Sequence, residues 1–265
     1  MSSGAGDRIL RALAQAVEGG DPVVLATIVE TTGSVPRHAG TKMVVGRDGA
    51  TVGTVGGGAV ESTIIDEALA LMRGRRSDLR TYTLRGPSEG EHGVCGGTMS
   101  VYLEPYMAPS TIYIIGAGHV GRAVSDLAHW VGYRTVVVDD RAELMDEASL
   151  PNADVRFTGT AEEALVTHPP APADAIVVVT RSHEVDARIT PALLATDAGY
   201  IGVMGSKRRW ALTRQALGDE GLSGEALDRI HNPIGLDIGA ETVEEIAVSI
   251  LSEVIAAHTG TGDCR

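Results

Sequence analysis

The sequence predicts an α/β protein of two modules: an N-terminal α+β module, followed by a Rossmann-like domain built on a parallel sheet. Three observations predict this fold class. The 265 residues include 33 glycines but only 3% aromatic residues, which favours an aliphatic core and many tight turns. Helical and strand patterns are mixed in the first part of the chain, whereas the rest alternates apolar strand runs with helical patterns, as βαβ units do. The pattern changes at Pro105 to Pro109, so we expect modules over residues 1–108 and 109–265.

The elements of the first module follow from the spacing and type of its residues. Apolar residues recur at helical spacing from Ile9 to Val17, which predicts an amphipathic helix. The Asp48-Gly49 turn predicts a hairpin, and a helix over residues 60–72 is expected to end at Gly74. Short runs of apolar and β-branched residues predict strands over residues 23–29, 42–45, 51–55, 79–84 and 99–103.

The second module is predicted as a regular alternation of strands and helices. Four continuous apolar runs predict strands buried on both faces, over residues 112–115, 135–138, 175–179 and 200–204. Helical spacing predicts the helices that follow them, over residues 120–130, 161–166, 185–195 and 208–217. A last helix over 243–257 begins with a capping box made by Thr242 and Glu245.

Composition and charge narrow the classes of function. The net charge of −13 argues against a nucleic-acid partner, because contacts to phosphates need clustered lysine and arginine. The sequence has no apolar run of about 18 residues and no signal-peptide pattern, so we expect a cytoplasmic protein without a membrane span. Cys95 and Cys264 are too few for a disulfide framework or a four-ligand zinc site, and no metal site is expected.

The strongest local signal is Gly116-Ala117-Gly118-His119-Val120-Gly121, which follows a predicted strand and opens a predicted helix. In the dinucleotide-binding fingerprint the first glycine permits a tight turn, the second lets the backbone approach a pyrophosphate, and the third permits close packing. His119 and Val120 begin the helix, whose N-terminus favours an anion. We therefore expect this turn to bind a cofactor, while a turn that keeps the fold without a ligand stays open.

The residues after the next strand bear on which cofactor this turn would bind. Asp139 lies about 20 residues after the first glycine, where the fingerprint places the carboxylate that binds an adenine-ribose hydroxyl. Asp140 and Arg141 follow it directly. Because Arg141 could accommodate a phosphate on the ribose, NAD and NADP both stay open.

Two further glycine-containing turns are candidate anion sites. Gly56, Gly57 and Gly58 precede a predicted helix, and Arg37 and Lys42 could supply positive charge to the same place. Ser206, Lys207 and Arg208 begin another helix after a predicted strand, where the helix dipole favours an anion. In both cases a role in packing or solvation is as good an interpretation as binding.

Cys95 and His183 are the candidate reactive side chains. Cys95 lies in the glycine-rich segment Gly93 to Gly97 with His92 nearby, where a thiolate could be a nucleophile or a sulfur ligand. An inert cysteine in a turn is the alternative. His183 follows a predicted strand at the edge of the sheet where ligands bind, so it could contact a substrate or donate a proton.

Taken together, these motifs resemble the XdhC/CoxI family, the accessory proteins of molybdenum hydroxylases, and the resemblance covers nearly the whole chain. The first half is similar to the CoxI-type module in residues 30–37, 53–61 and 94–97. The second half is similar to the family's Rossmann-type module in residues 115–121, 138–141, 200–208 and 231–239. Many motifs in one order make this resemblance more specific than any one of them.

The resemblance implies a chaperone that binds molybdenum cofactor (molybdopterin), holds it while a cysteine desulfurase-type sulfurase replaces an oxo ligand by sulfido, and inserts it into a xanthine-dehydrogenase-like apoenzyme. It also implies a homodimer without turnover of its own. Family members often have a cysteine after the three glycines, where this chain has Ala59, which leaves Cys95 as the candidate sulfur contact. The alternative is an NAD(P)-dependent oxidoreductase with His183 or Lys207 near its substrate.

Overall fold

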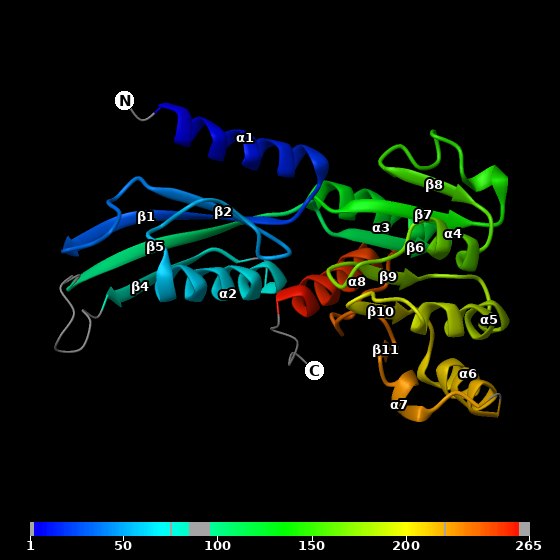
Figure 1. Cartoon of the computed structure of the whole chain (residues 1–265). Coiled ribbons are helices and arrows are strands. Elements are labelled where there is room, and N and C mark those ends of the chain that lie inside the picture. The colour runs from blue at the N-terminus through cyan, green and yellow to red at the C-terminus, as the bar shows by residue number, and fades with distance from the viewer. Residues whose placement is uncertain (1–2, 75, 85–95, 220, 260–265) are drawn as a thin grey trace. The chain divides into compact units, whose positions relative to one another are not determined.

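The structure is a computed structural model that describes residues 3–74, 76–84, 96–219 and 221–259 (Figure 1). Its backbone contacts divide the chain into two compact units, Met1–Ala108 and Pro109–Arg265. None of the helices in the described ranges is long and apolar enough to cross a membrane.

The first unit is an antiparallel sheet with one helix on each face. Its five strands follow the order β3-β2-β1-β5-β4 and are β1 (Val23–Gly33), β2 (Lys42–Gly46), β3 (Thr51–Gly53), β4 (Asp78–Leu84) and β5 (Gly97–Tyr106). Its helices are α1 (Ser3–Gly19) and α2 (Gly58–Gly74). Because side chains alternate along a strand, one face of β1 packs on α2 through Ala26 and Ile28, and the other packs on α1 through Leu25.

The second unit is a parallel sheet covered by helices on both faces. Its strands follow the order β11-β10-β9-β6-β7-β8 and are β6 (Thr111–Ile115), β7 (Arg134–Asp139), β8 (Val155–Thr158), β9 (Ala175–Val178), β10 (Tyr200–Val203) and β11 (Ile230–His231). Its helices are α3 (His119–Val131), α4 (Ala161–Thr167), α5 (His183–Leu194), α6 (Lys207–Asp219), α7 (Gly224–Leu227), α8 (Val243–Thr259) and the short 3-10 turn η1 (Ala142–Leu144).

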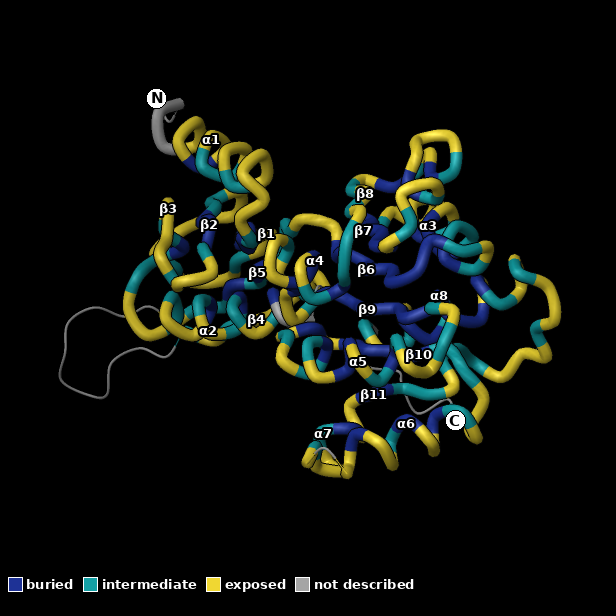
Figure 2. The backbone as a smooth tube through the Cα atoms, turned by 90° about the vertical axis from the view of Figure 1, so that its right-hand side faces the viewer, coloured by how far each residue is buried: buried dark blue, intermediate teal, exposed yellow. Residues whose placement is uncertain are grey.

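Two aliphatic cores hold the helices against this sheet. Helices α3 and α8 pack on one face, where Val124 and Ile250 meet residues of β6 and β9 such as Ile114. Helices α4, α5 and α6 pack on the other, where Leu165 and Ile189 join the second core. Figure 2 shows β6 and β9 buried along their length, as expected for central strands of a sheet that is covered on both faces.

The predicted fold class, a mixed module followed by a Rossmann-like parallel sheet, is confirmed. The structure adds elements that the sequence patterns did not predict: strands β8 and β11, helix α7 and the turn η1. In chain order the strands run from β6 outward through β7 to β8, and then return to the other side of β6 with β9. The loops that follow β6 and β9 therefore diverge, which makes this point the switch point where open α/β sheets bind ligands.

Candidate functional site

An open pocket lies at the switch point, at the carboxyl edge of the parallel sheet. Its floor is apolar and includes Ile115, Val138 and Ile189. Its rim carries charge and hydrogen-bonding groups, and the polar and glycine lining residues are Gly116, Asp139, Asp140, Arg141, Gly159, Thr160, Thr180, Arg181 and Arg188. An apolar floor with a few polar groups at the rim is typical of a small-molecule site.

The structure accounts in different ways for the three glycines of the turn after β6. Gly116 has φ +117°, and a Cβ there would lie 2.7 Å from the carbonyl oxygen of Val179. A Cβ at Gly121 would lie 1.8 Å from the carbonyl oxygen of Gly116, so the packing of α3 requires glycine there. Gly118 has an ordinary φ of −69°, and a Cβ there would meet nothing within 4 Å. Neither backbone strain nor packing requires glycine at position 118. Close approach of a ligand to the backbone would account for a glycine there.

The start of α3 presents backbone N–H donors next to the space that a side chain at position 118 would fill. Gly118 is the N-cap residue of α3 and makes no side-chain cap hydrogen bond. Within the described residues, no acceptor meets the N–H groups of Gly118, His119 or Val120. The His119 side chain is exposed, while Val120 packs against the core of α3 and α8. Unpaired N–H groups at a helix N-terminus favour an anion.

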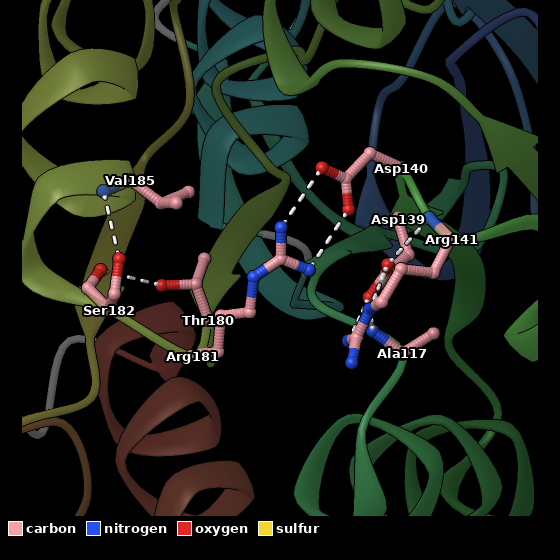
Figure 3. A network of polar contacts seen from close by, with 8 residues as sticks. All are labelled: Ala117, Asp139, Asp140, Arg141, Thr180, Arg181, Ser182 and Val185. Atoms are coloured by element: carbon pink, nitrogen blue, oxygen red, sulfur yellow. Dashed lines mark hydrogen bonds and ion pairs between the residues drawn. The ribbon is translucent and has the colours of Figure 1, made fainter.

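Asp139 lies where the sequence predicts it, at the end of β7, and its carboxylate is fully engaged within the protein (Figure 3). Oδ1 accepts from the backbone N–H of Arg141 at 3.0 Å and from its Nε at 2.8 Å. Oδ2 accepts from Arg141 Nη2 at 2.8 Å and from the N–H of Ala117 at 2.7 Å. Since a carboxylate has about four acceptor positions, none is left for a ribose hydroxyl in this arrangement.

These contacts shift the titration of Asp139. The side chain is 4% exposed, and burial by itself raises its pKa. The hydrogen bonds and the charge of Arg141, with the N–H of Ala117, outweigh burial and lower the pKa of Asp139 to about 2. Asp139 is therefore ionised at neutral pH, and its hydrogen bonds fix the glycine turn to the end of β7.

Asp140 points the other way and pairs with Arg181, which follows β9 (Figure 3). Arg181 Nη1 and Nη2 donate to the two carboxylate oxygens of Asp140, each at 3.2 Å, and both side chains are 53% exposed. Sequence reasoning did not single out Arg181, although its place directly after a parallel strand was a signal for it. A third pair, Arg188 with Glu162 at 3.8 Å, lies at the same pocket.

The start of α5 is held by a buried acid rather than by His183. Thr180 Oγ1 donates to Asp186, which is 2% exposed, at 2.5 Å, and Arg209 of α6 pairs with the same carboxylate. His183 is exposed, and its Nε2 lies 3.3 Å from Glu184 Oε1. Nothing in the described residues orients its imidazole toward the pocket, so its proposed contact with a substrate stays a prediction.

The basic segment after β10 does not line the pocket. Ser206, Lys207 and Arg208 are exposed, and Ser206 Oγ accepts from the N–H of Arg209 at 3.2 Å. Arg209, the next residue, pairs with Asp186 of α5, and neither of these two residues lines the pocket. The predicted anion site at the start of α6 is thus separate from the crevice.

In the first unit, Glu61 takes up donors of the three-glycine turn. Its Oε2 accepts from Thr54 Oγ1 at 2.5 Å and from the N–H groups of Val55 and Gly57, each at 3.0 Å. Burial raises the pKa of Glu61, but these hydrogen bonds outweigh it and the pKa is lowered. Gly57 and Gly58 have φ of +76° and +68°, which accounts for glycine there through backbone conformation.

The other predicted residues of the first unit are placed only in part. Pro36 lies against Gly56, where a Cβ would meet the proline ring at 2.6 Å, so the exposed Arg37 follows a residue that contacts the glycine turn. Lys42 Nζ donates to Thr27 within the sheet at 3.0 Å. Cys95 lies outside the described residues, and its role as a sulfur contact stays a prediction.

The segment after β11 forms a buried network that sequence reasoning did not predict. Glu253 of α8 accepts from Tyr200 Oη at 2.8 Å and from the N–H of Gly235 at 2.5 Å, and its Oε1 lies 3.1 Å from His231 Nδ1. The rings of Tyr200 and His231 are 4.7 Å apart. The sequence signal for this network was Glu253, an acidic residue within a largely apolar helix. The network fixes residues 231–235 to α8, which is a structural role.

The fold and the pocket define a class of protein: a two-unit α/β protein whose Rossmann-type unit has a glycine turn with unpaired backbone donors beside a switch-point pocket. A model of the XdhC Rossmann domain matches residues 112–254, and a model of the XdhC and CoxI family matches residues 16–83. The chain belongs to the XdhC family, which confirms the resemblance that its motifs predict.

Relatives from two bacteria agree with this family. The uncharacterised protein YqeB of Escherichia coli K12 is 33% identical over 88% of this chain, which spans 43% of the length of YqeB. A Bacillus subtilis 168 protein, named as a probable xanthine dehydrogenase subunit, is 25% identical, over 90% of this chain and 94% of its own. The molybdenum cofactor insertion chaperone PaoD of E. coli K12 is 28% identical, over 94% of this chain and 88% of its own.

A solved structure shares the fold. The crystal structure of a Bacillus halodurans protein, described as a xanthine dehydrogenase, aligns with a TM-score of 0.52 and 24% identity, over 93% of this chain and 94% of its own. At this identity the likeness supports the fold alone.

Proposed function

We propose that this protein is an accessory chaperone of a molybdenum hydroxylase, which binds molybdenum cofactor as cargo and inserts it into a xanthine-dehydrogenase-like apoenzyme. The observation that carries the proposal is membership of the XdhC family across both units, together with the similarity to the insertion chaperone PaoD over 94% of this chain. We include in the proposal a homodimer in the cytoplasm and a cysteine desulfurase-type sulfurase that acts while the cofactor is held.

The residues of the crevice fit a phosphate-bearing heteroaromatic cargo. The phosphate would take the unpaired N–H groups at the start of α3, where Gly118 leaves the space that a side chain would fill. The flat ring would lie on the apolar floor of the pocket, with the Arg141 and Arg188 guanidinium groups at the rim. The proposal also keeps Cys95 as the candidate sulfur contact, which the resemblance implies.

The alternative, an NAD(P)-dependent oxidoreductase, has less support. A dinucleotide of this class is held in part by a carboxylate that accepts the ribose hydroxyl, and all acceptor positions of Asp139 are taken by Ala117 and Arg141. His183 and Lys207 are exposed and do not line the pocket. Their position therefore gives no reason to place a substrate beside either of them. We therefore do not propose it.

A transfer assay tests the insertion role. Protein purified without oxygen from a host that makes molybdopterin is mixed with a cofactor-free molybdenum hydroxylase, and recovery of the hydroxylase activity is measured. We expect faster recovery with this protein than with the same amount of free cofactor, and no such gain with Gly118→Asp, which places a carboxylate where the phosphate would lie. Equal recovery with free cofactor and with the wild-type protein would contradict the proposal.

A further inference from the structure

The ion pair between Asp140 and Arg181 connects the ends of two strands that are not neighbours. Asp140 follows β7 and Arg181 follows β9, and β6 lies between these strands in the sheet. Both side chains line the pocket, and their hydrogen bonds cross the carboxyl end of β6, where the glycine turn begins (Figure 3). A ligand that fills the pocket and reaches this turn meets the pair.

The charges at the rim are not equivalent. Arg141 is bound to Asp139 through two of its guanidinium nitrogens, and Asp139 is buried, so this pair is fixed. The pair of Asp140 with Arg181 is half-exposed on both sides and its two N···O distances are long, at 3.2 Å. Exposed ion pairs contribute little to stability, so Arg181 can leave Asp140 at small cost.

Arg181 also has the chemistry that an anion needs. Its guanidinium group presents two parallel N–H donors, and this fork matches a phosphate oxygen pair as well as it matches a carboxylate. The Asp140 carboxylate now occupies the position of such an anion. Once released, it can turn into solvent, since it is 53% exposed.

We propose that Arg181 is the residue that clamps the anionic group of the ligand, a phosphate ester or diphosphate, and that it does so by exchanging the Asp140 carboxylate for the ligand. This inference rests on the proposed function only in placing a phosphate-bearing ligand in the same crevice. Asp140 then acts as a competitor that keeps Arg181 in place until a ligand arrives, and it lowers the affinity for the ligand.

Calorimetric titration of the full chain with inorganic pyrophosphate tests the exchange. We expect Asp140→Asn to bind pyrophosphate about fivefold more tightly than the wild type, because an exposed competing pair is removed. Arg181→Ala is expected to bind about 10- to 100-fold more weakly, because charge-assisted hydrogen bonds are lost. In the Arg181→Ala background, Asp140→Asn should change the affinity less than about twofold at physiological salt, which screens longer-range repulsion.

The matched control is a second surface pair of the same kind. Arg214 and Asp228 form an ion pair at 2.8 Å away from the pocket lining, and Asp228→Asn should leave pyrophosphate binding unchanged. An equal gain from Asp140→Asn with and without Arg181 would contradict the exchange, because it would reflect charge repulsion alone. Absence of pyrophosphate binding at millimolar concentration in every variant would contradict it as well. A protein that carries no pterin but shows the expected coupling would overturn the proposed function and leave the exchange standing.

Discussion

Four N–H donors meet on the Asp139 carboxylate, and this convergence ties two parts of the pocket together. The donors come from the turn after β6 and from Arg141, so the acid joins the glycine turn to the end of β7. Hydrogen bonds to a charged group are among the stronger ones in proteins. Removal of this charge should therefore loosen the crevice before it affects the rest of the unit.

Asp139→Asn should destabilise the protein by about 2 kcal/mol at neutral pH, since the pKa of Asp139 falls from 3.8 to about 2 on folding. Because the folded-state pKa is the lower one, the stabilisation is complete above about pH 4 and is lost as the pH falls toward 2. Urea unfolding of both proteins at pH 7 and near pH 3 measures it, and the difference between them should shrink at the lower pH. A difference that does not depend on pH would mean that the charge is not the cause.

The glycines of the turn predict opposite outcomes for two substitutions. Gly118→Asp should leave the melting temperature unchanged or slightly higher, since aspartate is a favourable N-cap and position 118 has room for it. It should also abolish retention of a phosphate-bearing ligand. Gly121→Ala should destabilise the protein by about 1–3 kcal/mol or more, because its Cβ would overlap the Gly116 carbonyl oxygen. Thermal unfolding and ligand content, measured on both variants, check this; equal destabilisation would contradict it.

At the scale of elements, periodic patterns and continuous apolar runs were predictable, and the two edge strands β8 and β11 were not. Strand β6 and helix α3 carry a run of apolar residues and a strong amphipathic period, and both were predicted. Strand β8 has four residues at the sheet edge, with alternating partial burial, and β11 has two. Each of these exists because a neighbouring strand pairs with it, as Ile230 does with Ile201, and one segment of sequence does not contain that information.

The candidate site was predictable to a similar degree. The glycine turn and the place of Asp139 followed from spacing along the chain, because both lie on one βαβ unit. The hydrogen bonds of Asp139 depend on side-chain directions, and the pair of Asp140 with Arg181 joins residues that are 41 positions apart in the sequence. Such contacts arise from the three-dimensional fold and leave no pattern in one segment of sequence.

The turn before α2 gives a prediction at the scale of an element. Glu61 accepts three hydrogen bonds from residues that precede α2, so Glu61→Ala should destabilise the first unit by about 2–3 kcal/mol. Asp66→Ala is the control, since Asp66 is exposed on the same helix. Denaturant unfolding of the two variants compares them. A loss of the same size in both would show that helix propensity, rather than the cap on the glycine turn, sets the stability.

At the scale of the whole molecule, the chain combines two units with separate hydrophobic cores, and each unit is matched by its own model of the XdhC family. The similarity to PaoD extends over both. The chain carries a net charge of −13, while arginines are placed at the rim of the switch-point pocket. This contrast favours a small anionic cargo over a nucleic acid, because a nucleic acid needs a broad basic surface.

The central claim is that this protein carries a molybdenum-containing pterin. Native mass spectrometry of the protein, purified without oxygen from a host that makes molybdopterin, tests it most directly when the released small molecules are identified after denaturation. We expect a pterin adduct on the wild-type protein and its loss from Gly118→Asp. A nicotinamide dinucleotide with no pterin, or a wild-type protein that carries neither, would contradict the claim.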